Sequence, residues 1–202
     1  MNRAALAVAL LCGATSASAV DPVIRYPYRV EGVCPFECCQ YGQWTARSDI
    51  PVVAAERAHT APAFTIRAGE TFEAVGGAWW TTAPYVLKPN VPVELTVASN
   101  FRPQGNDRAR LGSEWTNDAH VSVPAGTEIH VVADLGEGAQ VGLAGGKAVM
   151  IDESAADPGS DYSVAKPRAA KANEWWIEVK SAGRHGWFER GEQEISGSDA
   201  CE

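Results

Sequence analysis

The sequence predicts an all-β fold held together by disulfide bonds, and three observations support this. From Trp175 onward, large apolar residues alternate with polar ones before a glycine-containing turn, which is typical of a half-buried β-hairpin. Residues 65–75 and 123–132 each place Ala-Gly before a run that favours a strand. Four cysteines lie beyond a predicted export signal. The hydrophobic content of 46% is sufficient for a packed core.

Residues 1–19 have the features of a secretory signal peptide. Arg3 precedes an apolar run from Ala4 to Cys12, and the segment ends in Ala-Ser-Ala. The run is too short for a membrane-spanning helix, which needs about 20 residues, and no later stretch is sufficiently apolar. A lipoprotein signal at Cys12 is the alternative, although Leu11 stands where such signals place a small residue. We therefore expect no membrane span and an exported protein, periplasmic or extracellular, whose mature chain starts at Val20.

The charge distribution argues against a nucleic-acid partner. The formal net charge is -8, and no basic run occurs. Proteins that bind nucleic acid draw much of their affinity from clustered Lys and Arg side chains. Because the acidic residues are dispersed, we interpret them as a solvated surface and not as an acidic docking tail.

The mature chain retains four cysteines: Cys34, Cys38, Cys39 and Cys201. Export favours disulfides, and three pairings are formally possible. A bridge between the adjacent Cys38 and Cys39 would close a strained ring, so we expect one local bridge from Cys34 and one long bridge from Cys38 or Cys39 to Cys201. The long bridge would tie the C-terminal tail, residues 193–202, to the N-terminal arm. Closing so long a loop contributes on the order of 4 kcal/mol to stability.

The spacing of these cysteines does not favour a metal or redox site. A closed zinc site usually supplies two separated ligand pairs, but here there is neither Cys-x-x-Cys nor a companion histidine pair. A thiol-disulfide oxidoreductase also needs Cys-x-x-Cys at the start of a helix. We therefore expect no metal and no cofactor. The histidines are scattered along the chain: His59, His120, His130 and His185.

The predicted hairpin covers residues 173–189. Trp175, Ile177 and Val179 fall on one face of its first strand. Gly183 and Gly186 flank the predicted reversal, because glycine adopts positive φ without steric cost, and a short second strand, Trp187-Phe188, follows.

The pattern Trp176-x-x-Val179, followed by Gly183 and Gly186-Trp187, resembles the late hairpin of bacterial SH3-like (SH3b) domains. The segment Thr65 to Val75, with its I-x-x-Gly-Glu-x-Φ pattern, is similar to their central part. The resemblance implies a small, strongly bent β-barrel that binds peptides, cell-wall material or a partner protein, and it implies no reaction. The alternative is an unrelated hairpin with a glycine turn.

The repeated Ala-Gly motif predicts two SH3-like units in tandem, residues 48–95 and 96–192, the second enlarged by inserted loops. The alternative is ordinary turn-to-strand chemistry without a second barrel. Residues 20–47, rich in Pro, Cys and aromatic side chains, predict an irregular arm pinned by disulfides. We interpret the glycine-rich residues 135–142 as turns, since their spacing does not fit a dinucleotide-binding loop, and residues 152–173 as a long exposed loop.

The sequence offers no recognisable catalytic motif. Gly-x-Ser-x-Gly, His-Glu-x-x-His and Gly-x-x-x-x-Gly-Lys are all absent. Strand alternation can bury only one ring of each Trp-Trp pair, so we expect the other ring to face outward, where it can stack on sugars or prolines. The alternative is that the outward rings cover the barrel end or the N-terminal arm. The expected ligand-binding residues are Trp79, Trp80, Tyr85 and Trp176.

These observations predict an exported, non-enzymatic binding module of the bacterial cell envelope. Its expected partner is a cell-wall fragment, a peptide or an envelope protein. A cell-envelope hydrolase or redox accessory with a dispersed active site is the alternative. A polar cleft that holds a histidine in contact with a carboxylate would favour the hydrolase.

Overall fold

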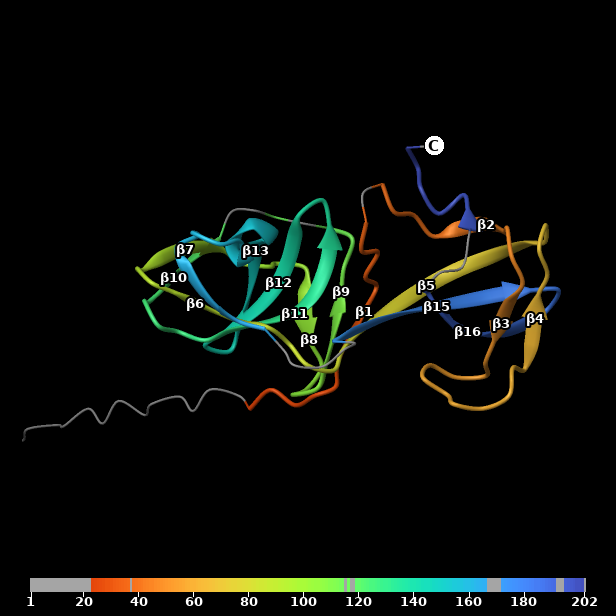
Figure 1. Cartoon of the computed structure of the whole chain (residues 1–202), viewed down its shortest axis with the longest axis horizontal. Helices are drawn as coiled ribbons and strands as arrows, with labels where there is room; N and C mark the ends of the chain where they lie inside the picture. Colours follow the sequence, from red (N-terminus) through yellow and green to blue (C-terminus); the bar gives the residue numbers. More distant parts are fainter. Residues whose placement is uncertain are drawn as a thin grey trace, which may run out of the picture.

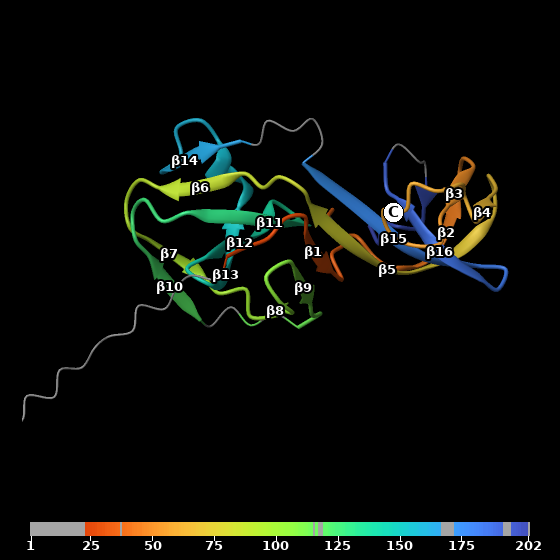
Figure 2. The same cartoon turned by 90° about the horizontal axis from the view of Figure 1, so that it is seen from below.

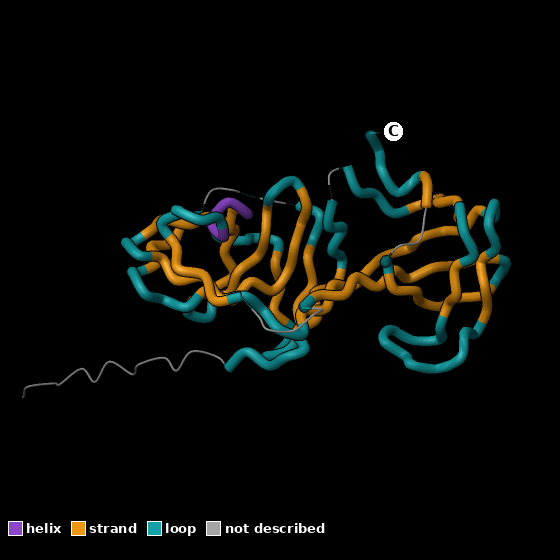
Figure 3. Tube along the Cα trace, in the orientation of Figure 1, coloured by secondary structure: helices purple, strands orange, loops and turns teal. Residues whose placement is uncertain are grey.

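A computed structural model describes residues 23–36, 38–114, 116, 119–166, 172–191 and 195–201. The described chain forms two β-rich lobes joined by the long strands β5 (Thr71–Thr81) and β15 (Asn173–Ser181) (Figures 1 and 3). Its one helical element is a short 3-10 helix, η1 (Glu153–Ala156), so the all-β prediction is confirmed for this part of the chain. The predicted signal peptide, residues 1–19, lies outside the described residues. Within the described chain, no helix is long and apolar enough to cross a membrane.

One lobe, here called the barrel lobe, contains the predicted hairpin, β15–β16 (Figure 2). Its main strands follow the antiparallel order β17-β2-β5-β15-β16. A separate hairpin, β3–β4, joins β16 through two backbone hydrogen bonds between Val53 and Trp187, each 2.8 Å long, so the sheet curls round on itself. The remaining strand bounds are β2 (Gly42–Ala46), β3 (Ile50–Val52), β4 (Phe64–Ile66), β16 (Arg184–Glu189) and β17 (Ile195–Ser196).

The hairpin β15–β16 is present where the sequence predicts it, but its two glycines have different roles. The reversal is made by Ala182 and Gly183, with φ of 48° and 74°. Gly186 lies within β16, where a Cβ atom would stand 2.5 Å from the Val53 carbonyl oxygen. Gly186 therefore allows the close approach of β3 to β16, and it does not form the turn.

The second lobe, here called the inserted lobe, is built from residues 82–166 together with residues 23–33. Its larger sheet has the order β13-β12-β11-β6-β14, and β7 pairs with β10. The strand β1 (Tyr28–Glu31) runs antiparallel to the end of β5 and parallel to β9. It thereby connects this lobe to the sheet that contains β5 and β15, here called the central sheet. The other bounds are β6 (Val86–Pro89), β7 (Val93–Thr96), β8 (Phe101–Pro103), β9 (Arg108–Leu111), β10 (His120–Val123), β11 (Ile129–Gly136), β12 (Ala139–Ala144), β13 (Lys147–Asp152) and β14 (Tyr162–Ala165).

This arrangement does not follow the expected boundary between residues 95 and 96. Because β15 pairs along almost the whole of β5, the barrel lobe contains strands from both expected units. Most of the inserted lobe lies in the chain between the end of β5 and the start of β15. The Ala-Gly motifs do form matching turns, with φ of 86° at Gly69 and 77° at Gly126. The resemblance between the two segments is thus seen in the turns, since the strands that follow belong to different sheets.

Three other segments are more regular than the sequence predicts. The expected irregular arm, residues 20–47, contributes β1 and β2 to the central sheet. In the glycine-rich segment, only Glu137 and Gly138 form the turn, and Ala139 onward is the strand β12. The expected loop at 152–173 contains η1 and β14. The strands β1, β2 and β14 are ordered by pairing with distant strands, which local composition does not reveal, whereas β12 pairs with its chain neighbours β11 and β13.

Candidate functional site

The four aromatic residues expected to bind a ligand do not converge on one groove. They fall into two groups on opposite faces of the central sheet. Trp80 and Trp176 lie on the face covered by the loop after β3, whereas Trp79 and Tyr85 line a small cavity on the other side.

Trp80 is held in a polar network. Its indole Nε1–H donates to the Glu56 carboxylate over 2.7 Å, and the Arg57 guanidinium lies 5.0 Å from the ring centroid. Glu56 also accepts two hydrogen bonds from Arg29, at 2.9 and 2.6 Å. Arg29 lies on β1 of the inserted lobe, and Glu56 lies on the loop after β3 of the barrel lobe. This network therefore connects the two lobes. We call these four residues the latch.

Trp176 is buried, with 7% of its surface exposed, and so is Trp175, with 6%. The expectation that one ring of this pair faces outward is therefore wrong. Strand alternation places the two rings on opposite faces of the sheet. The loop that carries Arg57 covers the face on which Trp176 lies, and the Arg57 guanidinium pairs with the Glu174 carboxylate at 2.9 Å. The Glu174 carboxylate in turn accepts the Trp176 Nε1–H over 3.0 Å.

Trp79 and Tyr85 border a cavity of about 20 Å³ between the two lobes, which is the size of a single water molecule. Trp79 packs against the cores of both lobes. The Tyr85 hydroxyl donates to the Gln140 side-chain oxygen, and burial raises the pKa of this phenol to about 12. This site is too small for a sugar or a peptide side chain.

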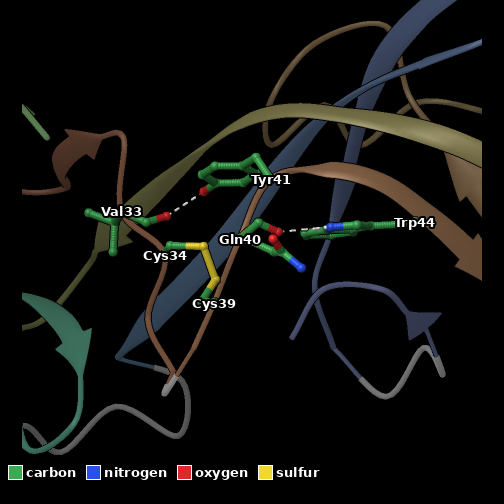
Figure 4. The surroundings of a disulfide bond; sticks show 6 residues. All are labelled: Val33, Cys34, Cys39, Gln40, Tyr41 and Trp44. Atoms are coloured by element: carbon green, nitrogen blue, oxygen red, sulfur yellow. Dashed lines mark hydrogen bonds between the residues drawn. A yellow bond between two sulfur atoms is a disulfide. The ribbon is translucent and has the colours of Figure 1, made fainter. Parts of the chain in front are cut away.

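The four cysteines form two disulfides, Cys34–Cys39 and Cys38–Cys201, with Cα–Cα distances of 5.5 and 5.7 Å. Figure 4 shows the first of them. The prediction of one local and one long bridge is confirmed, and the partner of Cys201 is Cys38. Beside the local bridge, Tyr41 donates to the Val33 carbonyl oxygen, which fixes this loop against the sheet. Among the described residues, one group has the spacing of a metal site, Cys38, Cys201 and Asp199, but its two sulfur atoms are bonded to each other.

A cavity with a volume of about 810 Å³ lies in the inserted lobe. This volume suits a small-molecule ligand. Four separate segments form its walls: residues 23–28, the end of β8 with the β8–β9 turn, residues 127–130, and the end of β12 with the β12–β13 turn. The lining residues are Val23, Ile24, Tyr28, Pro103, Gly105, Asn106, Thr127, Glu128, His130, Leu143, Gly145 and Gly146.

One wall of this cavity carries a chain of polar groups. The Tyr26 hydroxyl lies 3.2 Å from His130 Nδ1, and His130 Nε2 lies 3.5 Å from a Glu128 carboxylate oxygen. The other Glu128 oxygen pairs with the Lys88 ammonium at 2.9 Å. The hydrogen bond from Lys88 lowers the pKa of Glu128, which therefore stays ionised at neutral pH. Burial raises the pKa of Tyr26 and brings that of Tyr28 to about 12, so both phenols stay protonated.

These residues were not predicted as a site from the sequence. In the sequence His130 is one of four scattered histidines, and Glu128 belongs to a turn that precedes a strand. Glu128 and His130 are two positions apart, and residues i and i+2 of an extended segment point to the same side. This spacing could have indicated that the two side chains lie together. The contributions of Asn106 and Leu143 to the lining, and the contact of Tyr26 with His130, had no such signal, since these residues come from distant segments.

Comparisons of the chain with protein-family models, curated proteins and solved structures found no match.

Proposed function

We propose that this protein is a non-enzymatic binding module of the cell envelope, built on an SH3-like barrel, and that its ligand occupies the cavity of the inserted lobe. The observation that carries the proposal is the cavity itself, a space of about 810 Å³ with apolar and polar walls. Ligand sites in proteins typically have this size and this mixture of surfaces.

The barrel part of the proposal has its own support. The strand order β17-β2-β5-β15-β16, closed by the contact of β3 with β16, is compatible with the small bent barrel that the resemblance implies. The two disulfides agree with folding in an oxidising compartment, such as the periplasm or the cell exterior. Under this proposal the barrel lobe is a stable support, and the inserted lobe carries the ligand.

The test is a titration followed by NMR, using cell-wall fragments and proline-rich peptides as ligands. We expect at least one of them to shift the signals of His130 and Ile24, which line the cavity. Replacing Leu143 with Trp fills the cavity and should abolish the shifts. Val91, 48% exposed, is absent from the cavity lining, so Val91→Trp serves as the matched control and should bind normally. Binding that persists unchanged in the Leu143→Trp variant would place the ligand elsewhere and contradict the proposal.

A hydrolase is the second candidate, because His130 and Glu128 meet at the cavity wall. A nucleophile is harder to find. Among the described lining residues Thr127 has the one aliphatic hydroxyl, and it makes no hydrogen bond to His130. The nucleophile–base contact on which covalent hydrolysis depends is therefore not formed. Turnover of a peptide or ester substrate that disappears in His130→Gln, with ligand binding retained, would favour this candidate over the binding module.

A further inference from the structure

Charged side chains are sparse in the described lining of the cavity in the inserted lobe. Glu128 is the one carboxylate among the described lining residues, and neither Lys nor Arg lines the cavity. Four cationic residues adjoin the lining in sequence but are not part of it: Arg25, Arg102 and Lys147 are exposed, and Arg29 pairs with Glu56. Lys88 neutralises Glu128 from behind through one carboxylate oxygen, at 2.9 Å.

The other carboxylate oxygen of Glu128 is available to a ligand. Its nearest described partner is His130 Nε2 at 3.5 Å, which is too long for a strong hydrogen bond. Half of the Glu128 side chain is exposed, at 55%, and the residue lines the cavity. This oxygen can therefore accept a hydrogen bond from a donor placed inside the cavity.

The contact between Tyr26 and His130 Nδ1 bears on which ring nitrogen of a neutral His130 carries the proton. The phenol stays protonated because burial raises its pKa. Its hydroxyl can donate to His130 Nδ1, and this direction requires the tautomer of the neutral ring in which Nδ1 carries no proton. In that tautomer the ring proton is on Nε2, the nitrogen that lies beside Glu128. In this state His130 adds no charge to the cavity wall.

The remaining walls are largely apolar. The side chains of Val23, Ile24, Pro103 and Leu143 contribute hydrocarbon surface. Val23 is 70% exposed, so its side chain loses water when a ligand covers it. Burial of such surface gives roughly 25 cal/mol per Å² of favourable free energy. A ligand that uses the whole cavity needs an apolar body as well as a polar head.

From these observations we infer that the cavity accepts an amphipathic cation, that is, a ligand with an apolar body and an ammonium head. The body lies against Ile24, Pro103 and Leu143, and the ammonium donates to the Glu128 oxygen that does not pair with Lys88. A carboxylate head is disfavoured, because the ionised Glu128 can accept but not donate a hydrogen bond, Lys88 is already paired with Glu128, and no Lys or Arg of the described lining can pair with a second carboxylate. This inference rests on the proposed function and specifies the chemistry of the same site.

Three probes of equal length test the head group: hexylammonium, 1-hexanol and hexanoate. Each is titrated into the full chain at pH 7.5, and binding is followed by NMR at Ile24 and His130. We expect hexylammonium to bind about tenfold more tightly than hexanoate, the ratio that one favourable charge contact can give. Glu128→Gln should reduce this ratio to about twofold or less, because it removes the charge and keeps the shape. Glu94→Gln is the control, since Glu94 is an exposed carboxylate on β7 and should leave the ratio unchanged.

The outcomes separate the inference from the proposed function. Equal binding of the three probes, or tighter binding of hexanoate, overturns the preference for a cation while the cavity remains a ligand site. A preference that survives in Glu128→Gln overturns the assigned role of that carboxylate. If none of the probes shifts the cavity signals, both the inference and the proposed binding site fail.

Discussion

The barrel lobe and the inserted lobe fill their interiors with different side chains. In the barrel lobe, Trp44, Phe72, Trp175 and Phe188 pack edge to face, with ring centroids 6.1 to 6.4 Å apart. The inserted lobe is filled mainly by Val, Ala, Leu and Ile, and it keeps the large cavity. Both disulfides are anchored beside β2, on the barrel lobe's side. The difference teaches that dense aromatic packing and empty space are divided between the lobes, since large interlocked rings leave little empty space and small aliphatic side chains leave more.

Trp44→Ala gives the sharpest test of this contrast. Trp44 is fully buried, touches Phe72 and Trp175, and donates its indole N–H to the Gln40 carbonyl oxygen over 2.9 Å. We expect a loss of about 4 kcal/mol in the free energy of unfolding, measured by urea denaturation with circular dichroism. The matched change in the inserted lobe, Leu87→Ala, should cost about 3 kcal/mol. A smaller loss for Trp44 than for Leu87 would contradict the division.

Cys201→Ser removes the long disulfide and should cost about 3 kcal/mol, because the unfolded chain gains the freedom that the bridge had removed. The tail itself should loosen, since β17 pairs with β2 and Ala200 donates to the Cys38 carbonyl oxygen. Thermal unfolding measures the loss, and thiol titration should find one free thiol, at Cys38. Probe binding in the cavity should be unchanged. Mass spectrometry of the non-reduced wild-type digest should contain the Cys38–Cys201 peptide, and a free Cys201 or a bridge between two chains would refute the assignment.

Glu56→Ala tests the latch between the lobes. It leaves the mostly buried guanidinium of Arg29 and the Trp80 indole without their shared acceptor. We expect a loss of about 2 kcal/mol, since an unsatisfied polar group costs more than a hydrogen bond gains. Glu73→Ala is the control, an exposed carboxylate on β5 whose removal should change stability by less than about 0.5 kcal/mol. Equal effects of the two substitutions would show that the latch carries no stabilising energy.

The smallest effect concerns pH. In the barrel lobe, the Asp49 carboxylate accepts the Ala68 backbone N–H at 3.0 Å and pairs with Arg67 at 2.6 Å, and these contacts lower its pKa below the ordinary value of 3.8. A lowered pKa in the folded state stabilises the protein above the unfolded-state pKa, and this contribution is lost as the pH falls through the folded-state value. Asp49→Asn should therefore weaken the fall of the melting temperature between about pH 5 and pH 2. Parallel curves for variant and wild type would exclude this contribution.

Local patterns were sufficient for the elements whose residues lie close together in the chain. The alternation of Trp175, Ile177 and Val179 predicts a strand with one buried face, and all three are buried. The cysteine spacing predicts one short and one long bridge, and both are present. These predictions succeed because strand period and ring strain are properties of the covalent chain.

Tertiary packing decided the role of each glycine and of each tryptophan. Gly77 lies where a Cβ atom would stand 2.7 Å from the Trp175 Nε1 and 3.1 Å from the Trp176 carbonyl oxygen, which nothing in the local sequence reveals. Trp176 is buried because a loop from residues 53–58 brings Arg57 to Glu174 on its face of the sheet. A strand pattern specifies which residues share a face, but not whether another segment covers that face.

The sequence by itself determined the all-β class, the hairpin at residues 173–189 and the local and long disulfides, because these follow from side-chain periodicity and cysteine spacing. Only the tertiary structure decided that residues 82–166 form a lobe inserted between β5 and β15, and that Tyr26, Glu128 and His130 come together beside a cavity. The reason is physical: contacts between residues more than 100 positions apart depend on how whole sheets pack, and that packing is chosen by the total free energy of the chain, which no short segment encodes.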